Sequence, residues 1–312
     1  MLTGATVLTL GLAAGGCTPR RSPWQPPGVL FIGLGVASDE VISPELLADV
    51  QDRFRKLQTA YRMLNTNTVI RFNLYPEGQM VEAIRHRTWA GLAPDLLLVN
   101  GDTARELLEA GLTDPFPAPP DLLANFDPDE IRRLRTTSGA LVGLPMLVQT
   151  QLACFNRKRL PQAPATVEAL LAQSAAGHPI GLPTTLTNLF WSAGSLGAVP
   201  GLNEAVAGRR PDPAQRAGIE GWLAWLQNAN NQQRVMFFDD QESAQRDLIN
   251  GKLDWITCRS TQLPILTRQM GGRLAVAALP DGAAGAQASP INRLRVLSLG
   301  RNSSGSGRER AL

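Results

Sequence analysis

The chain has 312 residues, of which 44% are hydrophobic and 18% charged, which is enough to bury a substantial core and to form two domains. Its formal net charge is +3, and no run of basic residues is interleaved with aromatic ones, which argues against nucleic-acid binding. There are two histidines and three cysteines, with no Cys-x-x-Cys pair or Cys/His cluster, so a structural zinc site is not expected.

The N-terminal stretch MLTGATVLTLGLAAGGC is a short apolar run that ends in small residues before Cys17. The run is too short to span a bilayer comfortably and is typical of an export signal. Its small residues before a cysteine resemble the bacterial lipobox, which implies cleavage before Cys17 and acylation of its sulfur. The usual positive residues at the start of such a signal are missing, and a buried N-terminal helix is the alternative.

The stretch after residue 27 alternates strands and helices, as expected for βαβ units and a parallel sheet. A later strand stops at Asn100 within APDLLLVNGDTARELLEAGLTDPF, at the strand end where open α/β sheets place ligands, and Asp102 is positioned to cap the next helix. The expected elements are strands at 28–36 and 68–75, helices at 45–64 and through Met80 and Ile84, a strand ending at Asn100, and a helix ending near Gly111.

After Pro115 the chain is Pro-rich and then enters an apolar extended run at 139–156, which we expect to carry it from one lobe into another. A second α/β series follows, with a clear helix start at Asp212 and Pro213. The segments at 273–282 and 291–300 are predicted to return as strands. The apolar stripe expected on the helix after Pro213 consists of Ile219, Trp222, Leu223 and Leu226.

Cys154 and Cys258 each lie in an apolar, strand-like stretch. In an oxidising compartment the two thiols would pair, but two buried free thiols explain the pattern equally well. The sequence leaves both interpretations open.

Two glycine-containing patterns invite a catalytic or cofactor interpretation, and both are weak. GLG at 33–35 follows a strand, but the third glycine of a dinucleotide fingerprint is absent. AGSLG at 193–197 has Gly194 directly before Ser195, whereas a nucleophile elbow needs the glycine two positions earlier. We therefore expect no cofactor.

Titratable residues give no clearer catalytic centre. His86 lies in the Arg-rich stretch IRHR and His178 in the loop AGHP, and both are interpreted as surface residues. Asp239, Asp240 and Glu77 are able in principle to do acid/base chemistry, but FFDDQESAQRD is typical of a helix N-terminus, where acidic residues are favoured. The chain is expected to bind rather than to catalyse.

Several stretches resemble the family 1 extracellular solute-binding proteins, the receptors of ABC importers. Pro94-Asp95 precedes an apolar strand and a helix ending EAGLTDPF, and GALVGLPMLVQTQLACFNRKRLPQAPATVEALL at 139–171 is similar to the crossover segment of that family. LINGKLDW at 248–255 and AVAALPDG resemble second-lobe elements, and the pieces occur in the family's order.

The resemblance implies an α/β fold of the periplasmic-binding-protein type, in which two lobes joined by crossing segments hold a ligand in the cleft between them. Members of the family continue with further helices, so the chain is expected to be C-terminally truncated. The expected domains are a lipoprotein-type signal peptide at 1–17, a Pro-rich linker at 18–27, lobe I at 28–140, lobe II with the crossover at 141–272, and a return to an incomplete lobe I at 273–312.

By position, the resemblance implies that Asp102 meets ligand hydroxyls and that Gln149 is a polar cleft residue on the crossover strand. Asn188 and Trp191 fall on a second-lobe helix that lines the cleft in those relatives, where a flat aromatic ring suits a sugar. The alternatives are that Asp102 only caps its helix and that Trp191 belongs to the core. Further candidate ligand-binding residues are Asp39, Glu77, Gln79, Asn100, Thr184, Trp255 and Arg259.

We therefore expect a receptor outside the cytoplasm, anchored to the membrane through lipid on Cys17, that delivers a sugar or another small polar solute to a membrane permease. Val99 and Val167 stand where relatives often carry aromatics, which leaves the solute open. One alternative is an exported hydrolase that uses Asp239 or Asp240. Another is an envelope scaffold or sensor that kept the fold without a ligand.

Overall fold

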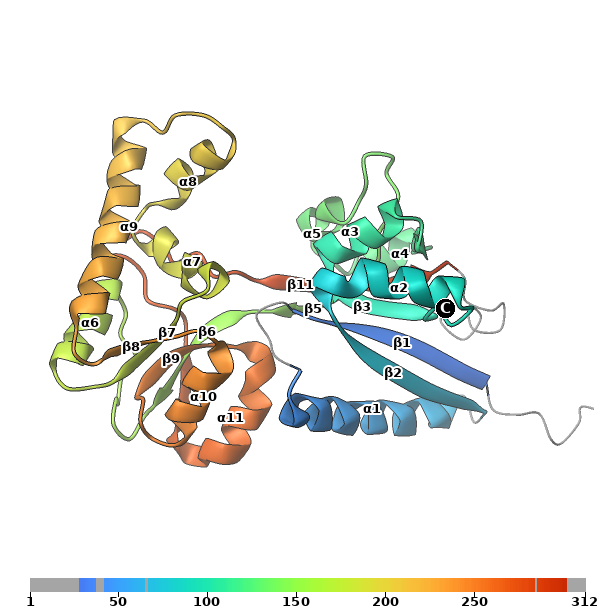
Figure 1. The fold of residues 1–312 in the computed structure, drawn as a ribbon, viewed down its shortest axis with the longest axis horizontal. Coiled ribbons are helices and arrows are strands. Elements are labelled where there is room, and N and C mark those ends of the chain that lie inside the picture. The colour runs from blue at the N-terminus through green and yellow to red at the C-terminus, as the bar shows by residue number, and fades with distance from the viewer. Residues whose placement is uncertain (1–27, 38–41, 65–66, 284, 302–312) are drawn as a thin grey trace, which may run out of the picture.

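The structure is a computed structural model that describes residues 28–37, 42–64, 67–283 and 285–301. The described chain forms two lobes, each built around its own β-sheet with helices on both faces (Figure 1). The expected signal peptide, the linker, Cys17 and Asp39 lie outside the described residues. Among the described helices, none is both long enough and apolar enough to cross a bilayer.

Lobe I contains a mixed sheet in the order β2-β1-β3-β11-β4, with β5 pairing beside β4 on the same side of β11. β1, β2 and β3 are parallel, whereas β11 runs antiparallel to β3, β4 and β5. Its strands are β1 (Gly28–Val36), β2 (Thr68–Pro76), β3 (Leu96–Asn100), β4 (Thr113–Asp114), β5 (Leu144–Gln149) and β11 (Arg293–Gly300). Its helices are α1 (Pro44–Leu64), the 3₁₀ turn η1 (Glu77–Gln79), α2 (Met80–Trp89), α3 (Gly101–Glu109), α4 (Pro120–Leu123) and α5 (Pro128–Arg133).

One face of the lobe I sheet is covered by α1. Alternate residues of β1 point to this face, where Leu30, Ile32 and Leu34 pack with Val50 and Phe54 of the helix. The spacing of the two helical residues, four apart, keeps both on the side of α1 that faces the sheet. The predicted strand at 28–36 is confirmed at both ends.

The opposite face of the same sheet is covered by α2 and α3. Leu97 and Val99 of β3 pack there with Met80 and Ile84 of α2 and Leu107 of α3. Figure 1 shows α1 on one side of the sheet and α2 and α3 on the other. This layering brings the carboxyl ends of β1, β2 and β3 to a single edge, which faces lobe II.

Lobe II contains a second mixed sheet in the order β10-β6-β9-β7-β8. β7 is parallel to β8 and β9, whereas β6 is antiparallel to β9 and β10. Its strands are β6 (Gln151–Asn156), β7 (Ile180–Pro183), β8 (Val235–Phe238), β9 (Trp255–Arg259) and β10 (Leu274–Ala277). Its helices and turns are α6 (Val167–Ala175), α7 (Leu186–Ser195), α8 (Val199–Val206), α9 (Pro213–Asn231), α10 (Gln241–Ile249), η2 (Ser260–Gln262), α11 (Leu263–Met270) and η3 (Gly271–Arg273).

Two neighbouring segments connect the lobes. β5 passes through Thr150 directly into β6, and the chain returns after β10 into β11. The segments touch where the backbone N–H of Ile291 donates to the Gln151 side-chain oxygen at 3.3 Å. Such paired crossing segments allow two lobes to rotate about a common hinge.

A disulfide joins Cys154 of β6 to Cys258 of β9, whose Cα atoms are 5.8 Å apart. The two strands are antiparallel neighbours, so the pair lies diagonally across one ladder inside the lobe II core. Of the two interpretations that the sequence left open, the structure therefore has the paired cysteines rather than two free thiols.

Three expectations need correction. The sheets were expected to be parallel but are mixed, because β11 runs antiparallel to β3 and β6 runs antiparallel to β9. The return to lobe I begins at Arg293 rather than at residue 273, since β10 pairs with β6 in lobe II. Leu223 of the predicted stripe on α9 is 54% exposed, while its neighbour Trp222 is buried.

Candidate functional site

A cleft of about 540 Å³ lies between the two lobes. Lobe I contributes α1 and the ends of β1, β5 and β11, and lobe II contributes α10, η2 and α11. The lobe I wall is mainly aliphatic, with Phe54 as its aromatic member. The lobe II wall is rich in side-chain amides and hydroxyls, among them Gln241, Gln245, Asn250, Thr261 and Gln262.

An ion pair also bridges the two lobes at this cleft. The carboxylate of Asp49 on α1 lies 3.6 Å from the guanidinium of Arg268 on α11 and 2.6 Å from that of Arg53, one turn along α1. Asp49 is nearly buried, with 10% of its side chain exposed, whereas both arginines remain in solvent contact. The contact depends on the present arrangement of the lobes.

A buried polar network forms the lobe I end of the cleft around Arg295 of β11. Its guanidinium donates to Glu77 at 2.6 Å, to the Asn100 side-chain oxygen at 2.9 Å, and to the carbonyl oxygens of Gly35 at 2.5 Å and Leu98 at 2.9 Å. Glu77 also accepts from the backbone N–H of Asn100 at 2.8 Å and from the Asn100 side-chain amide.

This network brings together two predicted site residues, Glu77 and Asn100, which come from different strand ends. Their polar atoms are mostly engaged within the protein, so they are held in fixed orientations rather than free in solvent. Gly35 allows the close approach, because a Cβ at this position would lie 2.6 Å from the Glu77 carboxylate oxygen. Arg295 therefore fastens the ends of β1, β2 and β3 to the strand that enters from the hinge.

Gln149 at the end of β5 lines the cleft, as the sequence predicted for a polar residue on the crossover strand. Its side-chain oxygen is buried and accepts no hydrogen bond from the described part of the chain. A buried acceptor without a donor is costly, so this oxygen is suited to a hydroxyl or N–H donor supplied by a bound solute.

Asn188 and Arg259 meet in lobe II. The guanidinium of Arg259 donates to the Asn188 side-chain oxygen at 3.1 Å, and the Asn188 amide donates to the Thr185 hydroxyl at 2.7 Å. Both Asn188 and Arg259 are about 1% exposed, and the Gln151 side chain donates to the Asn188 carbonyl at 2.9 Å. These hydrogen bonds join α7 to the start of β6 and to the end of β9.

Trp191 and Trp255 lie inside the lobe II core. Neither has any exposed surface, and their ring centroids are 6.1 Å apart. Trp225 adds a third ring at 6.2 Å from Trp191. In this arrangement of the lobes the indoles are packed against other core residues and present no face to the cleft.

The remaining predicted residues lie at the surface of their lobes. Asp102 is exposed in the first turn of α3 and does not cap that helix, which begins after Asn100 without a side-chain cap. Gln79 is exposed in η1. Thr184 is exposed after β7, and its hydroxyl donates to the Phe238 carbonyl at 3.1 Å.

Sequence reasoning missed Arg295 and the cleft-facing side of α10 and η2. A signal for Arg295 was present, because a charged residue inside the apolar stretch RLRVLSLG is rarely buried unless it has a partner. No comparable signal marks Thr261 or Gln262, since their place depends on how the two lobes meet.

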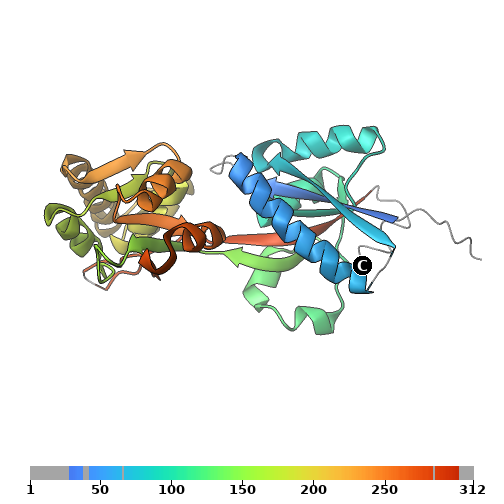
Figure 2. The ribbon, with the colours of Figure 1, turned by 90° about the horizontal axis from the view of Figure 1, so that it is seen from below.

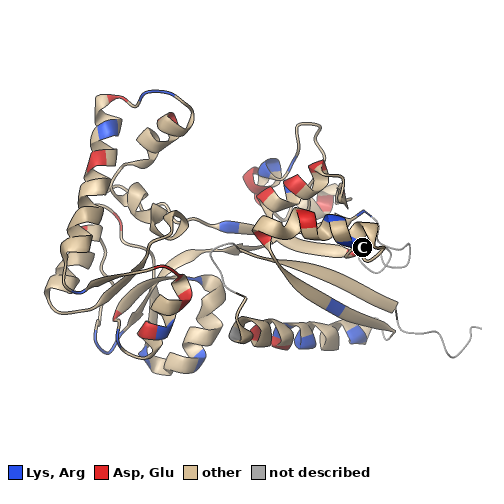
Figure 3. Cartoon of the chain, viewed as in Figure 1, with Lys and Arg blue, Asp and Glu red and all other residues tan. Residues whose placement is uncertain are grey.

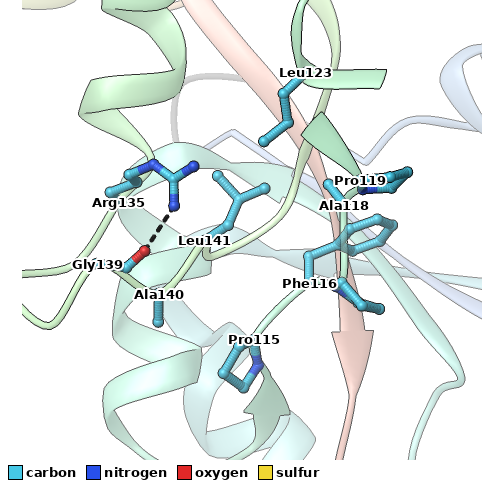
Figure 4. A pocket seen from close by; sticks show the side chains of 10 residues that line it. Pro115, Phe116, Ala118, Pro119, Leu123, Arg135, Gly139, Ala140 and Leu141 are labelled. Carbon is cyan, nitrogen blue, oxygen red and sulfur yellow. Dashed lines mark hydrogen bonds between the residues drawn. The ribbon is translucent and has the colours of Figure 1, made fainter. Parts of the chain in front are cut away.

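A second hollow of about 530 Å³ lies within lobe I, between the Pro-rich segment after β4 and the turn at 135–141 (Figure 4). Its lining is mostly apolar, and the guanidinium of Arg135 already donates to the Gly139 carbonyl at 2.7 Å. This hollow offers few groups that orient a polar solute, so the cleft between the lobes is the stronger candidate.

Two titratable residues outside the cleft, Asp240 and His178, have structural partners. Asp240 caps α10, as the sequence suggested, because its carboxylate accepts a hydrogen bond from the Ser243 backbone N–H at 2.6 Å. Burial raises the pKa of Asp240, but hydrogen bonds from the Ser243 hydroxyl and backbone and the charge of Arg246 outweigh it, so the pKa lies below its ordinary value. His178 lies 3.0 Å from the fully buried Asp254.

In the cartoon of Figure 3, Lys and Arg positions are interspersed with Asp and Glu positions over both lobes. His86 is a surface residue, 66% exposed, and lies 2.9 Å from Glu82. Within the described ranges, no group of three or more His, Cys, Asp or Glu residues is arranged to hold a metal ion.

Comparison with known proteins gives structural neighbours only. No protein-family model and no curated protein sequence matches the chain. One similar structure is the GacH receptor of Streptomyces glaucescens GLA.O, determined unliganded and with acarbose and an acarbose homolog; it has a TM-score of 0.68 and 14% identity over 92% of this chain and 75% of its own.

Another similar structure is an ABC transporter solute-binding protein from Thermotoga lettingae TMO bound with α-D-tagatose. It has a TM-score of 0.65 and 14% identity, covering 91% of this chain and 75% of its own. These likenesses extend over both lobes. The chain therefore has the two-lobe α/β fold of the periplasmic-binding-protein type.

Proposed function

We propose that this chain is the solute-binding receptor of an ABC importer and that the cleft between its lobes binds a sugar or another small polar solute. The observation that carries the proposal is the cleft itself, whose volume of about 540 Å³ lies in the range of small-molecule sites. It is shared by two lobes that are joined through a pair of crossing segments, the arrangement that permits closure around a ligand.

The chemistry of the lining supports a solute with several hydroxyl groups. Amide side chains of α10 and η2 donate and accept hydrogen bonds, and the Gln149 oxygen lacks a donor within the described residues. The aliphatic wall of lobe I suits the C–H face of a sugar ring. Two structural neighbours hold acarbose and tagatose, which supports a carbohydrate.

The further parts of the proposal concern the membrane. Small residues before Cys17 support cleavage and acylation at that cysteine, which would leave the receptor tethered outside the cytoplasm. The disulfide between Cys154 and Cys258 fits an oxidising compartment. Delivery to membrane permease subunits follows from the family that the sequence resembles.

The test is a thermal-shift screen of the mature chain, from Thr18 onward, against sugars, polyols and polyamines, with acarbose and tagatose included. A solute at one hundred times its dissociation constant should stabilise the fold by about 2.7 kcal/mol. Gln149→Leu should reduce that shift, whereas Gln233→Leu, an exposed glutamine in lobe II outside the cleft lining, should not.

A well-folded protein that shows no shift with any of these compounds would contradict the receptor proposal and favour a scaffold without ligand. The anchor is tested separately by mass spectrometry of the N-terminal peptide after expression in a lipoprotein-processing bacterium. Acylation should be present in the parent protein and absent from Cys17→Ser.

A further inference from the structure

The edge of lobe I opposite the cleft exposes large apolar side chains. In a βαβ unit the strands begin, and the helices end, at this edge. Here α1 ends with Met63 and Leu64, α2 ends with Trp89, Leu92 precedes β3, and Val29 lies at the start of β1. We call these five residues the lobe I tip.

The lobe I tip is exposed to an unusual degree. Met63 and Leu64 are more than 80% exposed, Trp89 is 75% exposed, and Leu92 and Val29 are 60% and 47% exposed. Figures 1 and 2 both show the start of β1 and the ends of α1 and α2 at the end of the molecule away from lobe II. The tip therefore projects away from the hinge and the cleft.

The residues around the tip suit a bilayer surface. Trp89 contacts the ring of His86 edge-on at 5.8 Å and otherwise faces solvent, and tryptophan is enriched at the level of lipid headgroups. Arg62 is exposed in the last turn of α1 beside Met63. An exposed arginine next to apolar residues favours a surface that carries phosphate groups.

The position of Cys17 in the sequence also supports a lipid bilayer as the surface that the tip contacts. Ten residues, 18–27, separate Cys17 from Gly28, where β1 begins at the tip. Even fully extended, that segment reaches about 40 Å. If Cys17 is acylated, as the proposed function holds, the tip, where the described chain begins, is held within about 40 Å of the membrane.

We propose that the lobe I tip rests on an anionic lipid bilayer, with Trp89 and Leu92 at headgroup level and Arg62 against lipid phosphates. The inference rests on the lipid anchor of the proposed function but not on the identity of the solute. Because the cleft lies at the opposite edge of the sheet, this contact turns the cleft away from the lipid and leaves it open to solutes.

The test uses the mature chain from Thr18 onward, which carries no lipid, in co-sedimentation with vesicles of phosphatidylglycerol and phosphatidylcholine in equal parts. Trp89→Ser with Leu92→Ser should lower the partition coefficient about tenfold through lost apolar contact. Arg62→Gln should lower it about fivefold, and only for vesicles that contain phosphatidylglycerol. Leu186→Ser with Val206→Ser, two exposed apolar residues of lobe II, is the matched control and should bind like the parent.

Failure of the parent chain to bind these vesicles, or equal binding by the tip variant, would overturn the inference. Analytical ultracentrifugation provides a second check. A dimer of the parent chain that is abolished by Trp89→Ser with Leu92→Ser would also overturn the inference, because the tip would then bind a second copy of the chain. A thermal shift with a solute that persists in the tip variant shows that the cleft is intact, so failure of membrane contact and failure of the receptor proposal are distinguishable.

Discussion

Loss of the Glu77 carboxylate should destabilise lobe I more than loss of an exposed acidic partner. The side chains of Glu77 and Arg295 are 7% and 5% exposed, and their nearest atoms are 2.6 Å apart. Glu77→Ala leaves the Arg295 cation buried without its carboxylate and removes the acceptor of two Asn100 donors. Breaking a buried pair in this way costs about 3–5 kcal/mol.

The measurement is urea unfolding combined with hydrogen exchange, which reports lobe I separately from lobe II. Asp52→Asn, which breaks the exposed pair with Lys56 at 2.8 Å on α1 of the same lobe, is the control and should leave the stability of lobe I nearly unchanged. Glu77→Gln should be intermediate, since it keeps an oxygen for the Asn100 backbone N–H. A loss below about 1 kcal/mol for Glu77→Ala would refute the view that Arg295 depends on this carboxylate.

Three further predictions concern single contacts. Cys154→Ser with Cys258→Ser should lower lobe II stability by about 2–5 kcal/mol in urea unfolding, because the bond closes 104 residues; an unchanged midpoint after reduction of the parent would argue against the bond. Asp240→Ala should cost about 1 kcal/mol at neutral pH as a lost cap. Because the pKa of Asp240 is lowered in the folded state, this difference is complete above the ordinary value of 3.8 and should vanish as the pH falls through the folded pKa; a difference that grows in acid would contradict the assignment. Gly35→Ala should cost about 1–3 kcal/mol through the clash with Glu77, and a neutral result by thermal melting would show that Glu77 moves freely.

Local patterns predicted the elements well because they are set by residues close in sequence. The apolar run at 28–36 became β1, the three-and-four spacing became α1, and Asp212 and Asp240 cap helices as expected. Asp102 is an instructive miss. Asn100 occupies the N-cap position of α3 instead, because β3 continues to that residue and the helix begins at Gly101.

The candidate site was less predictable because it depends on contacts between distant segments. Glu77 and Arg295 are 218 residues apart, and nothing near either residue in sequence indicates the other. Trp191 illustrates the same limit, since a tryptophan on an amphipathic helix suits a cleft or a core equally well until the packing partners Trp225 and Trp255 are known.

The position of β11 in the lobe I sheet has a consequence for the order of folding. Lobe II is contiguous from β6 to β10, so all of its strands are available before the last strand, β11, has been synthesised. Lobe I must wait for Arg293–Gly300 to insert between β3 and β4, and the same strand brings the counter-ion for Glu77. Until then β3 has an open edge, so we expect nascent lobe I to be the more aggregation-prone half of the chain.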